Sequence, residues 1–131
     1  MGTDVRMLQP GDLVPHFDAA PLEGPRISYR TIWQRQNLVL VALRPADVDG
    51  EYVEGLRRRM PELTANETAL LITRDEIPGL PAPGILVADR WGEVSYAWTA
   101  PTSSELPPPD EVLDWLRFTQ YRCPECEGEW R

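Results

Sequence analysis

The chain has two cysteines, three positions apart near its C-terminus, in the segment Cys123-Pro124-Glu125-Cys126. In a reducing compartment, cysteines at this spacing more often form a redox centre or part of a metal site than a structural disulfide. For redox chemistry the attacking thiol has to be a thiolate, and the adjacent Arg122 makes Cys123 the better attacker. The pair would then alternate between a dithiol and a disulfide.

Zinc is an alternative ligand for the same pair, because a tight Cys-Pro-x-Cys turn offers two sulfurs to one ion. A structural zinc site has four ligands, and the chain adds only one histidine, His16, and carboxylates. A site with four thiolates therefore requires two chains, each supplying Cys123 and Cys126. A third interpretation is a tail without a ligand, whose cysteines are reduced or closed into a local disulfide.

The surroundings of the cysteine pair disfavour a reactive thiolate. Residues 110–121 are predicted to form the last helix, so the cysteines follow a helix C-terminus, where the macrodipole opposes negative charge. Glu125, Glu127 and Glu129 add further negative charge. We therefore expect thiol exchange at this place to depend on a partner, either a protein or a small thiol.

Composition narrows the class of protein. The 131 residues carry 13 basic side chains, all of them arginine, and 21 acidic ones, for a net charge of -8. We expect no nucleic-acid partner, because an acidic domain repels phosphates and the run Arg57-Arg58-Arg59 falls on a solvated helix face. Because the chain has no lysine, a Schiff-base mechanism is excluded.

Hydropathy indicates no membrane segment. No window approaches the ~20 consecutive apolar residues that span a bilayer, and no secretory signal opens the chain. We therefore expect a cytoplasmic protein with no membrane partner.

Hydrophobic patterning predicts one α/β domain with a central sheet. Residues 38–43 are continuously apolar, as in a strand that is buried on both faces. Residues 93–98 alternate, which places Val94, Tyr96 and Trp98 on one face of a strand that forms a hairpin with residues 84–88. Further strands are predicted over residues 16–20, which pair with residues 26–28, and over residues 69–73. Helices are predicted over residues 29–36, 51–63 and 110–121. Pro61 should kink or end the second of these helices.

Three segments resemble the peroxiredoxin and alkyl hydroperoxide reductase/thiol-specific antioxidant family. Residues 8–17 resemble its opening motif Pro-Gly-Asp-x-x-Pro-x-Phe, and residues 38–45 resemble its central strand ending in proline. Residues 82–94 resemble the segment that contains a cis proline, a strand, a turn and a further strand. Together the likeness covers roughly residues 8–121.

This resemblance implies a thioredoxin-like α/β fold, a three-layer sandwich in which a mixed central sheet has helices on both faces. The chain then divides into a redoxin domain, residues 1–121, and a tail, residues 122–131, that carries the cysteines. The resemblance also implies a cis peptide bond before Pro83. The connection over residues 74–83 is short for the third helix of the family.

The sequence departs from the family at its reaction centre. Counting from Pro45, the positions of the family's threonine and attacking cysteine hold Asp49 and Tyr52. Neither side chain forms a sulfenic acid or a mixed disulfide, so peroxidase activity is not expected without a cysteine at position 52. The resemblance leaves a groove of Arg44, Asp49, Tyr52 and Pro83, a surface that receives a peptide or thiol substrate in active members.

Two functional hypotheses remain open. In the first, the chain is an atypical thioredoxin-like thiol-disulfide oxidoreductase that works without a cofactor through Cys123 and Cys126. In the second, it is a non-enzymatic binding module whose C-terminal cysteine turn holds zinc or docks a partner. A second copy of the chain, forming a homodimer, is one candidate for that partner.

Overall fold

The computed structural model describes residues 7–44, 50–102 and 105–121. Strands β3 to β6 form one sheet in the order β4-β3-β5-β6, while β1 and β2 form a separate two-stranded ribbon. Strand β3 is parallel to β4 and antiparallel to β5, so the sheet is mixed. The elements are β1 (Asp18–Ala19), β2 (Ile27–Ser28), the 3-10 helix η1 (Tyr29–Thr31), β3 (Asn37–Ala42), α1 (Gly50–Arg57), α2 (Met60–Ala65), β4 (Thr68–Thr73), β5 (Gly84–Ala88), β6 (Val94–Thr99) and α3 (Pro109–Tyr121).

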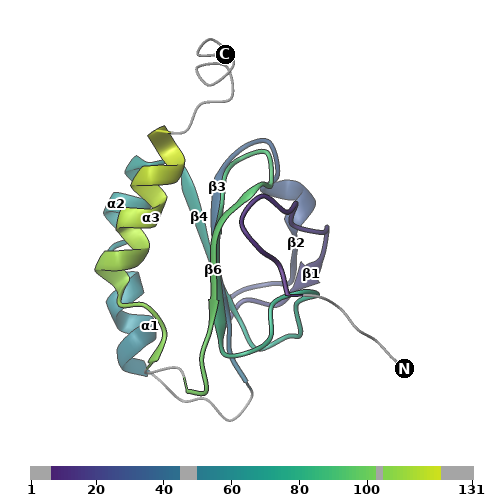
Figure 1. Cartoon of the computed structure of the whole chain (residues 1–131). Helices are drawn as coiled ribbons and strands as arrows, with labels where there is room; N and C mark the ends of the chain where they lie inside the picture. The colour runs from purple at the N-terminus through teal and green to yellow at the C-terminus, as the bar shows by residue number, and fades with distance from the viewer. Residues whose placement is uncertain (1–6, 45–49, 103–104, 122–131) are drawn as a thin grey trace.

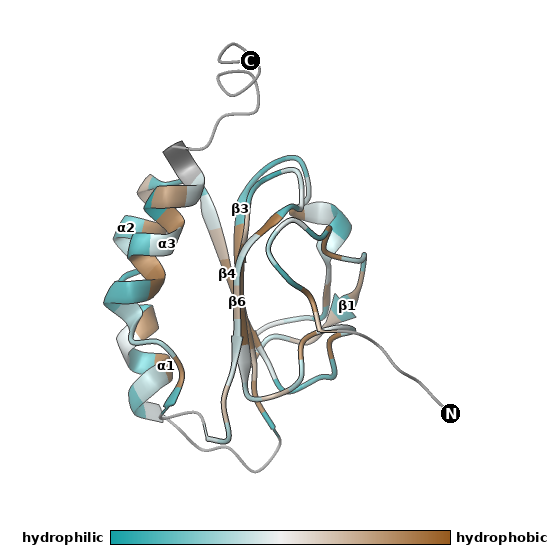
Figure 2. Ribbon diagram, in the orientation of Figure 1, coloured by the Kyte–Doolittle hydropathy of each residue, from teal (hydrophilic) through white to brown (hydrophobic). Residues whose placement is uncertain are grey.

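The sheet is the middle of three layers. Helices α1, α2 and α3 cover one face, and the β1–β2 ribbon with η1 covers the other (Figure 1). The outer sides of the helices are largely hydrophilic (Figure 2). The predicted three-layer α/β sandwich is confirmed, although the helical part of the second face is the single turn η1 rather than the whole of residues 29–36. None of the described helices is long and apolar enough to span a membrane.

Strand β3 forms the centre of the molecule, as its apolar run predicts. Each of its residues is at most 3% exposed. Leu38 and Leu40 pack toward the β1–β2 ribbon, while Val39 and Val41 pack toward the helices. Because both faces of this strand are covered, its side chains are apolar on both, with no alternation in the sequence.

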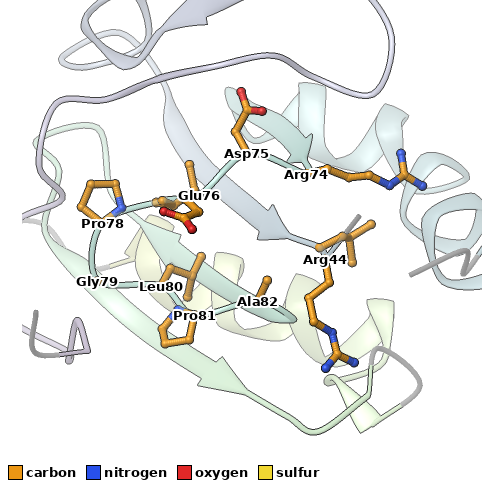
Figure 3. A pocket seen from close by; sticks show the side chains of 11 residues that line it. Arg44, Arg74, Asp75, Glu76, Pro78, Gly79, Leu80, Pro81 and Ala82 are labelled. Atoms are coloured by element: carbon orange, nitrogen blue, oxygen red, sulfur yellow. The ribbon is translucent and has the colours of Figure 1, made fainter. Parts of the chain in front are cut away.

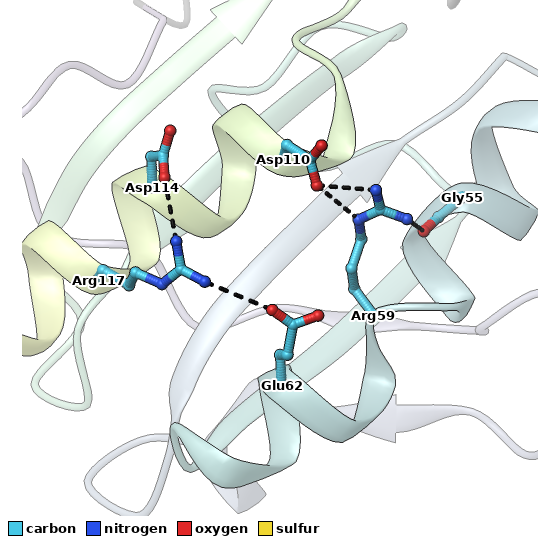
Figure 4. Close-up of polar contacts among 6 residues, drawn as sticks. All are labelled: Gly55, Arg59, Glu62, Asp110, Asp114 and Arg117. Atoms are coloured by element: carbon cyan, nitrogen blue, oxygen red, sulfur yellow. Dashed lines mark hydrogen bonds and ion pairs between the residues drawn. The ribbon is translucent and has the colours of Figure 1, made fainter.

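The predicted helix over residues 51–63 is two helices, α1 and α2. Pro61 lies in the first turn of α2, where its missing N–H costs no hydrogen bond. Inside a continuous helix the same proline would remove a hydrogen bond and clash with the preceding turn, so α1 ends before it. Arg59, at the break, contacts the Gly55 carbonyl at 3.1 Å and Asp110 at 2.7 Å. Arg117 of α3 contacts Glu62 of α2 at 3.4 Å (Figure 4). These contacts join both helices to α3 along its length.

The prediction that Val94, Tyr96 and Trp98 share one face is wrong for Val94. Val87 pairs with Tyr96 but Ala88 pairs with Val94, so Ser95 is an additional residue in β6. Such a β-bulge interrupts the alternation of side chains. Val94 consequently packs with the ribbon-side core, whereas Tyr96 packs with the helix-side core.

The two short strands before η1 are also shorter than predicted, with two residues each. Residues 74–83 contain no helix, in agreement with the expectation from their length. The predicted tail, residues 122–131, lies outside the described residues. The redox or metal-binding role of Cys123 and Cys126 therefore stays a prediction from the sequence.

Candidate functional site

An open groove of about 620 Å³ lies at the C-terminal ends of β3 and β4. These strands are parallel, so the loops that follow them meet at the same edge of the sheet, which is where ligands bind in open α/β sheets. The groove runs between the end of β3 and the loop after β4 (Figure 3). Its lining consists of Leu43, Arg44, Arg74, Asp75, Glu76, Ile77, Pro78, Gly79, Leu80, Pro81 and Ala82.

The apolar wall of the groove is held in place from behind. Ile77 and Leu80 form an isolated bridge across a turn, and both are buried. Gly79 in that turn has φ +82° and its carbonyl accepts a hydrogen bond from the Leu8 N–H at 2.8 Å. A Cβ atom at Gly79 would lie 2.8 Å from the Leu8 side chain, so glycine permits this close approach. The wall is therefore fixed against the N-terminal segment.

The carboxylate of Asp75 supports the fold rather than the groove. It accepts hydrogen bonds from the Ala20 N–H at 2.8 Å and from Arg26 at 3.2 Å. The Asp75 N–H in turn donates to the Thr73 hydroxyl at 3.0 Å. Asp75 thereby fastens the β1 end of the ribbon to the end of β4, which fixes the rim of the groove.

Two arginines mark one end of the groove. Arg44 follows β3 and donates a hydrogen bond to the Pro101 carbonyl at 2.9 Å, and Arg74 follows β4. Figure 3 shows both side chains at this end, with Glu76 and Pro78 at the other. A smaller hollow of about 250 Å³ continues from Leu43 and Arg74 toward helix α1. Arginines beside an apolar wall suit a ligand that has both apolar and carboxylate groups.

Of the predicted groove residues, Arg44 lines the groove, and Pro83 directly follows Ala82, which lines it. Pro83 is buried next to it, the Ala82–Pro83 bond is cis as the resemblance implies, and the Pro83 carbonyl accepts a hydrogen bond from the Ala100 N–H at 3.1 Å. A Cβ at Gly84 would lie 2.4 Å from the Pro81 carbonyl oxygen, so this turn admits only glycine. Asp49 lies outside the described residues.

Tyr52 is not part of the groove lining. Its hydroxyl donates a hydrogen bond to the Pro107 carbonyl at 2.8 Å, and its ring packs with the helix-side core. The position that the resemblance equates with the family's attacking cysteine thus holds a side chain that joins α1 to the connection before α3. This contact gives Tyr52 a structural role.

Sequence reasoning missed the residues of the loop after β4, in particular Arg74, Ile77 and Leu80. From its length, the sequence predicts only a connection over residues 74–83. The available signal was its position, since a ten-residue loop at the C-terminal end of a buried parallel strand is where binding residues concentrate.

Helix α3 ends at the opposite end of the sheet from the groove. Thr119, near the end of α3, is hydrogen-bonded to Ser95 at the start of β6, beside the end of β5 and the start of β3. Strand β3 spans six residues, or ~17 Å, between that end and the groove. Cys123 and Cys126 follow α3 in the sequence and lie outside the described residues.

The described part of the chain offers few other reactive groups. It contains no cluster of three or more His, Cys, Asp or Glu side chains that could hold a metal. Burial, with the charge of Asp89, raises the pKa of Tyr29 to about 12. Burial, with the charge of Glu111 and a hydrogen bond to it, raises the pKa of Tyr96 to about 12. Both phenols are therefore neutral at physiological pH.

Comparisons with known proteins identify the fold. No family model matches the sequence, and no curated protein matches it. The structure is similar to Mycobacterium tuberculosis AhpC, with a TM-score of 0.68 at 14% identity over 95% of this chain and 99% of that one. It is also similar to the reduced 2-Cys peroxiredoxin of Plasmodium vivax, with a TM-score of 0.68 at 11% identity over 82% of this chain and 80% of that one. Thus the chain has a thioredoxin-like fold of the peroxiredoxin type.

Proposed function

We propose that this protein is a thiol–disulfide redox protein that exchanges electrons through Cys123 and Cys126. The observation that carries the proposal is that no residue lining the groove of this redoxin-type fold has a thiol, while Tyr52 makes a hydrogen bond to the Pro107 carbonyl. Cys123 and Cys126 are the two cysteines of the sequence, so they supply the thiols that redox chemistry needs.

The proposed reaction reduces a disulfide of a protein or a small molecule. The Cys123 thiolate attacks one sulfur of that disulfide, the bond between its two sulfurs breaks, and the leaving thiolate takes a proton. Cys126, as a thiolate, then attacks the sulfur of Cys123, forms the intramolecular disulfide and releases the second thiol. Two electrons pass from the pair to the substrate, so the step needs no cofactor.

A trapping experiment with oxidised glutathione tests this reaction. Reduced wild-type protein should convert to its intramolecular disulfide without keeping glutathione, whereas Cys126→Ser should keep one glutathione on Cys123. Cys123→Ser should accumulate far less adduct, and Arg44→Ala, in the groove, should behave as wild type. Equal adduct in both cysteine variants, or no oxidation of the wild type, would contradict the proposal. Intact mass reports each species.

A second candidate is a zinc-binding or partner-binding module that uses the same cysteines. The observation that favours it is the position of the pair directly after the C-terminal end of α3, where the helix dipole favours a cation over a thiolate. Four-coordinate zinc would need the pairs of two chains. Native mass after zinc addition distinguishes this candidate, since it predicts a dimer with one zinc that Cys123→Ser abolishes. A metal-free protein would exclude zinc binding.

A further inference from the structure

The groove at the ends of β3 and β4 is charged at its two ends and apolar between them. Arg44 and Arg74 lie at one end and Glu76 at the other (Figure 3). The second acidic residue of the lining, Asp75, directs its carboxylate to the β1–β2 ribbon, where it accepts hydrogen bonds at 2.8 and 3.2 Å. The groove therefore has a positive end within a chain whose net charge is -8.

The two arginines are positioned by the backbone of adjacent strands. The residues that precede them are joined, because the Leu43 N–H donates to the Thr73 carbonyl at 2.8 Å. The guanidinium of Arg44 is oriented further by its hydrogen bond of 2.9 Å to the Pro101 carbonyl, a neutral acceptor. A carboxylate at this end of the groove lies in the field of both guanidinium groups, which are the strongest hydrogen-bonding partners of carboxylates in proteins.

The wall between the two ends offers few hydrogen-bond donors. Pro78 and Pro81 are exposed along it and have no N–H. The Leu80 N–H, between them, donates to the Ile77 carbonyl at 3.0 Å. An extended peptide binds by pairing its backbone with such donors and acceptors, so this wall disfavours a peptide. An alkyl chain needs only apolar surface, which the proline rings supply.

We propose that this groove binds an aliphatic monocarboxylate. The carboxylate lies at the end marked by Arg44 and Arg74, and the alkyl chain follows the wall toward Glu76. A ligand with a second carboxylate is disfavoured, because that group would meet either the apolar wall or Glu76. The volume of about 620 Å³ lies within the range of small-molecule sites, roughly 300–1,000 Å³.

The site is formed without a ligand. Ile77 and Leu80 are buried behind the wall, and Gly79 between them is hydrogen-bonded to Leu8. Little loop ordering therefore opposes binding. Neither Cys123 nor Cys126 takes part, so the site does not depend on the proposed redox reaction.

Calorimetric titration of the full chain with octanoate tests the class of ligand. Octanamide has the same shape without the charge, and suberate has the same number of carbons with a second carboxylate. Both should bind at least about tenfold more weakly than octanoate. Heptanoate and hexanoate should weaken binding by about two- to fourfold for each methylene removed. Absence of octanoate binding, or equal affinity for octanoate and octanamide, would overturn the proposal.

A matched pair of arginine variants tests the charged end. Arg74→Gln should raise the dissociation constant of octanoate at least about tenfold, because a charge-assisted hydrogen bond is lost. Arg58→Gln is the control, since Arg58 is exposed in the turn after α1, outside the groove lining. It changes the net charge equally and should bind octanoate as wild type does. Equal effects of the two variants would contradict recognition by the groove.

A second matched pair tests the wall. Pro81→Glu places a carboxylate along the path of the alkyl chain and should weaken octanoate binding at least about tenfold. Pro108→Glu changes another exposed proline, just before α3, and should have no effect. Circular dichroism reports whether each variant is folded. Cys123→Ser/Cys126→Ser should bind octanoate as wild type does, which separates this site from the redox proposal. Wild-type affinity in folded Pro81→Glu would refute the assigned path of the ligand.

Discussion

The two ends of the central sheet differ in what they carry. At the C-terminal ends of β3 and β4 lie a groove, two arginines and the cis peptide bond of Pro83, and none of the described residues there has a thiol. At the opposite end α3 finishes beside the start of β6, and the cysteine-bearing segment follows it. A peroxiredoxin-type fold can thus keep its groove while its thiols lie elsewhere in the chain. The fold therefore indicates where a ligand binds, whereas the location of the reaction depends on where the reactive side chains are in the sequence.

The largest expected effect is a loss of disulfide-reductase activity when Cys123 is replaced but not when the groove is altered. Cys123→Ser should reduce disulfide-reductase turnover to background, because the attacking sulfur is lost. Arg44→Ala should retain turnover with a small-molecule disulfide, since the groove takes no part in the sulfur exchange. Turnover of oxidised glutathione measures both. If Arg44→Ala abolished turnover while Cys123→Ser did not, the chemistry would belong to the groove.

The next largest effect concerns the helix that precedes the cysteines. Leu116→Ala should destabilise the protein by about 2–5 kcal/mol, because Leu116 is fully buried between α3 and the sheet. Met60→Ala, on the partly exposed surface of α2, is the control and should cost less than about 1 kcal/mol. Urea denaturation measures the free energy of unfolding of both. Equal losses would show that α3 is not anchored as described.

A smaller effect is expected where the family's attacking cysteine would lie. Tyr52→Phe removes the hydrogen bond to the Pro107 carbonyl and should lower the free energy of unfolding by about 1 kcal/mol. Thiol exchange should stay at the wild-type rate, because the Tyr52 hydroxyl donates to the Pro107 backbone carbonyl and not to a thiol. A loss of exchange with unchanged stability would give this position a chemical role and remove the contrast between the two ends.

The smallest effect is a loss of stability at alkaline pH. The pKa values of Tyr29 and Tyr96 are raised to about 12 in the folded protein, from 10 when unfolded. Between these values the folded state binds more protons than the unfolded state, so stability that is complete below pH 10 falls as the pH rises toward 12. Spectrophotometric titration of wild type and Tyr96→Phe should show one late-ionising phenol fewer in the variant. Ionisation of every tyrosine near pH 10 would contradict the described burial.

Much of the fold could be predicted from the sequence because its strongest signals are local. The apolar run of β3 and the helix break at Pro61 follow from burial on both faces and from the missing N–H of proline. The bulge at Ser95 could not be predicted, because the alternating pattern of β6 is the same with or without it. Its position depends on tertiary contacts with Val87 and Thr119.

The candidate site was predicted less completely, because its residues meet only in the folded chain. The resemblance predicts Arg44 and Pro83 in the groove; Arg44 lines it, and Pro83 directly follows Ala82, which lines it. The resemblance assigns Tyr52 to the same surface, but its hydroxyl contacts Pro107, which is 55 residues away in sequence. Ile77 gave no local signal, since an apolar residue in a proline-rich loop is ordinary.

The central claim is that Cys123 and Cys126 are the redox centre of this chain. The most direct measurement is the intact mass of the metal-free protein after equilibration in glutathione buffers of graded redox potential. We predict a reversible change between the dithiol and a form that is two hydrogens lighter, and no such change in Cys123→Ser. A wild-type mass that stays the same across the whole series of buffers would contradict the claim.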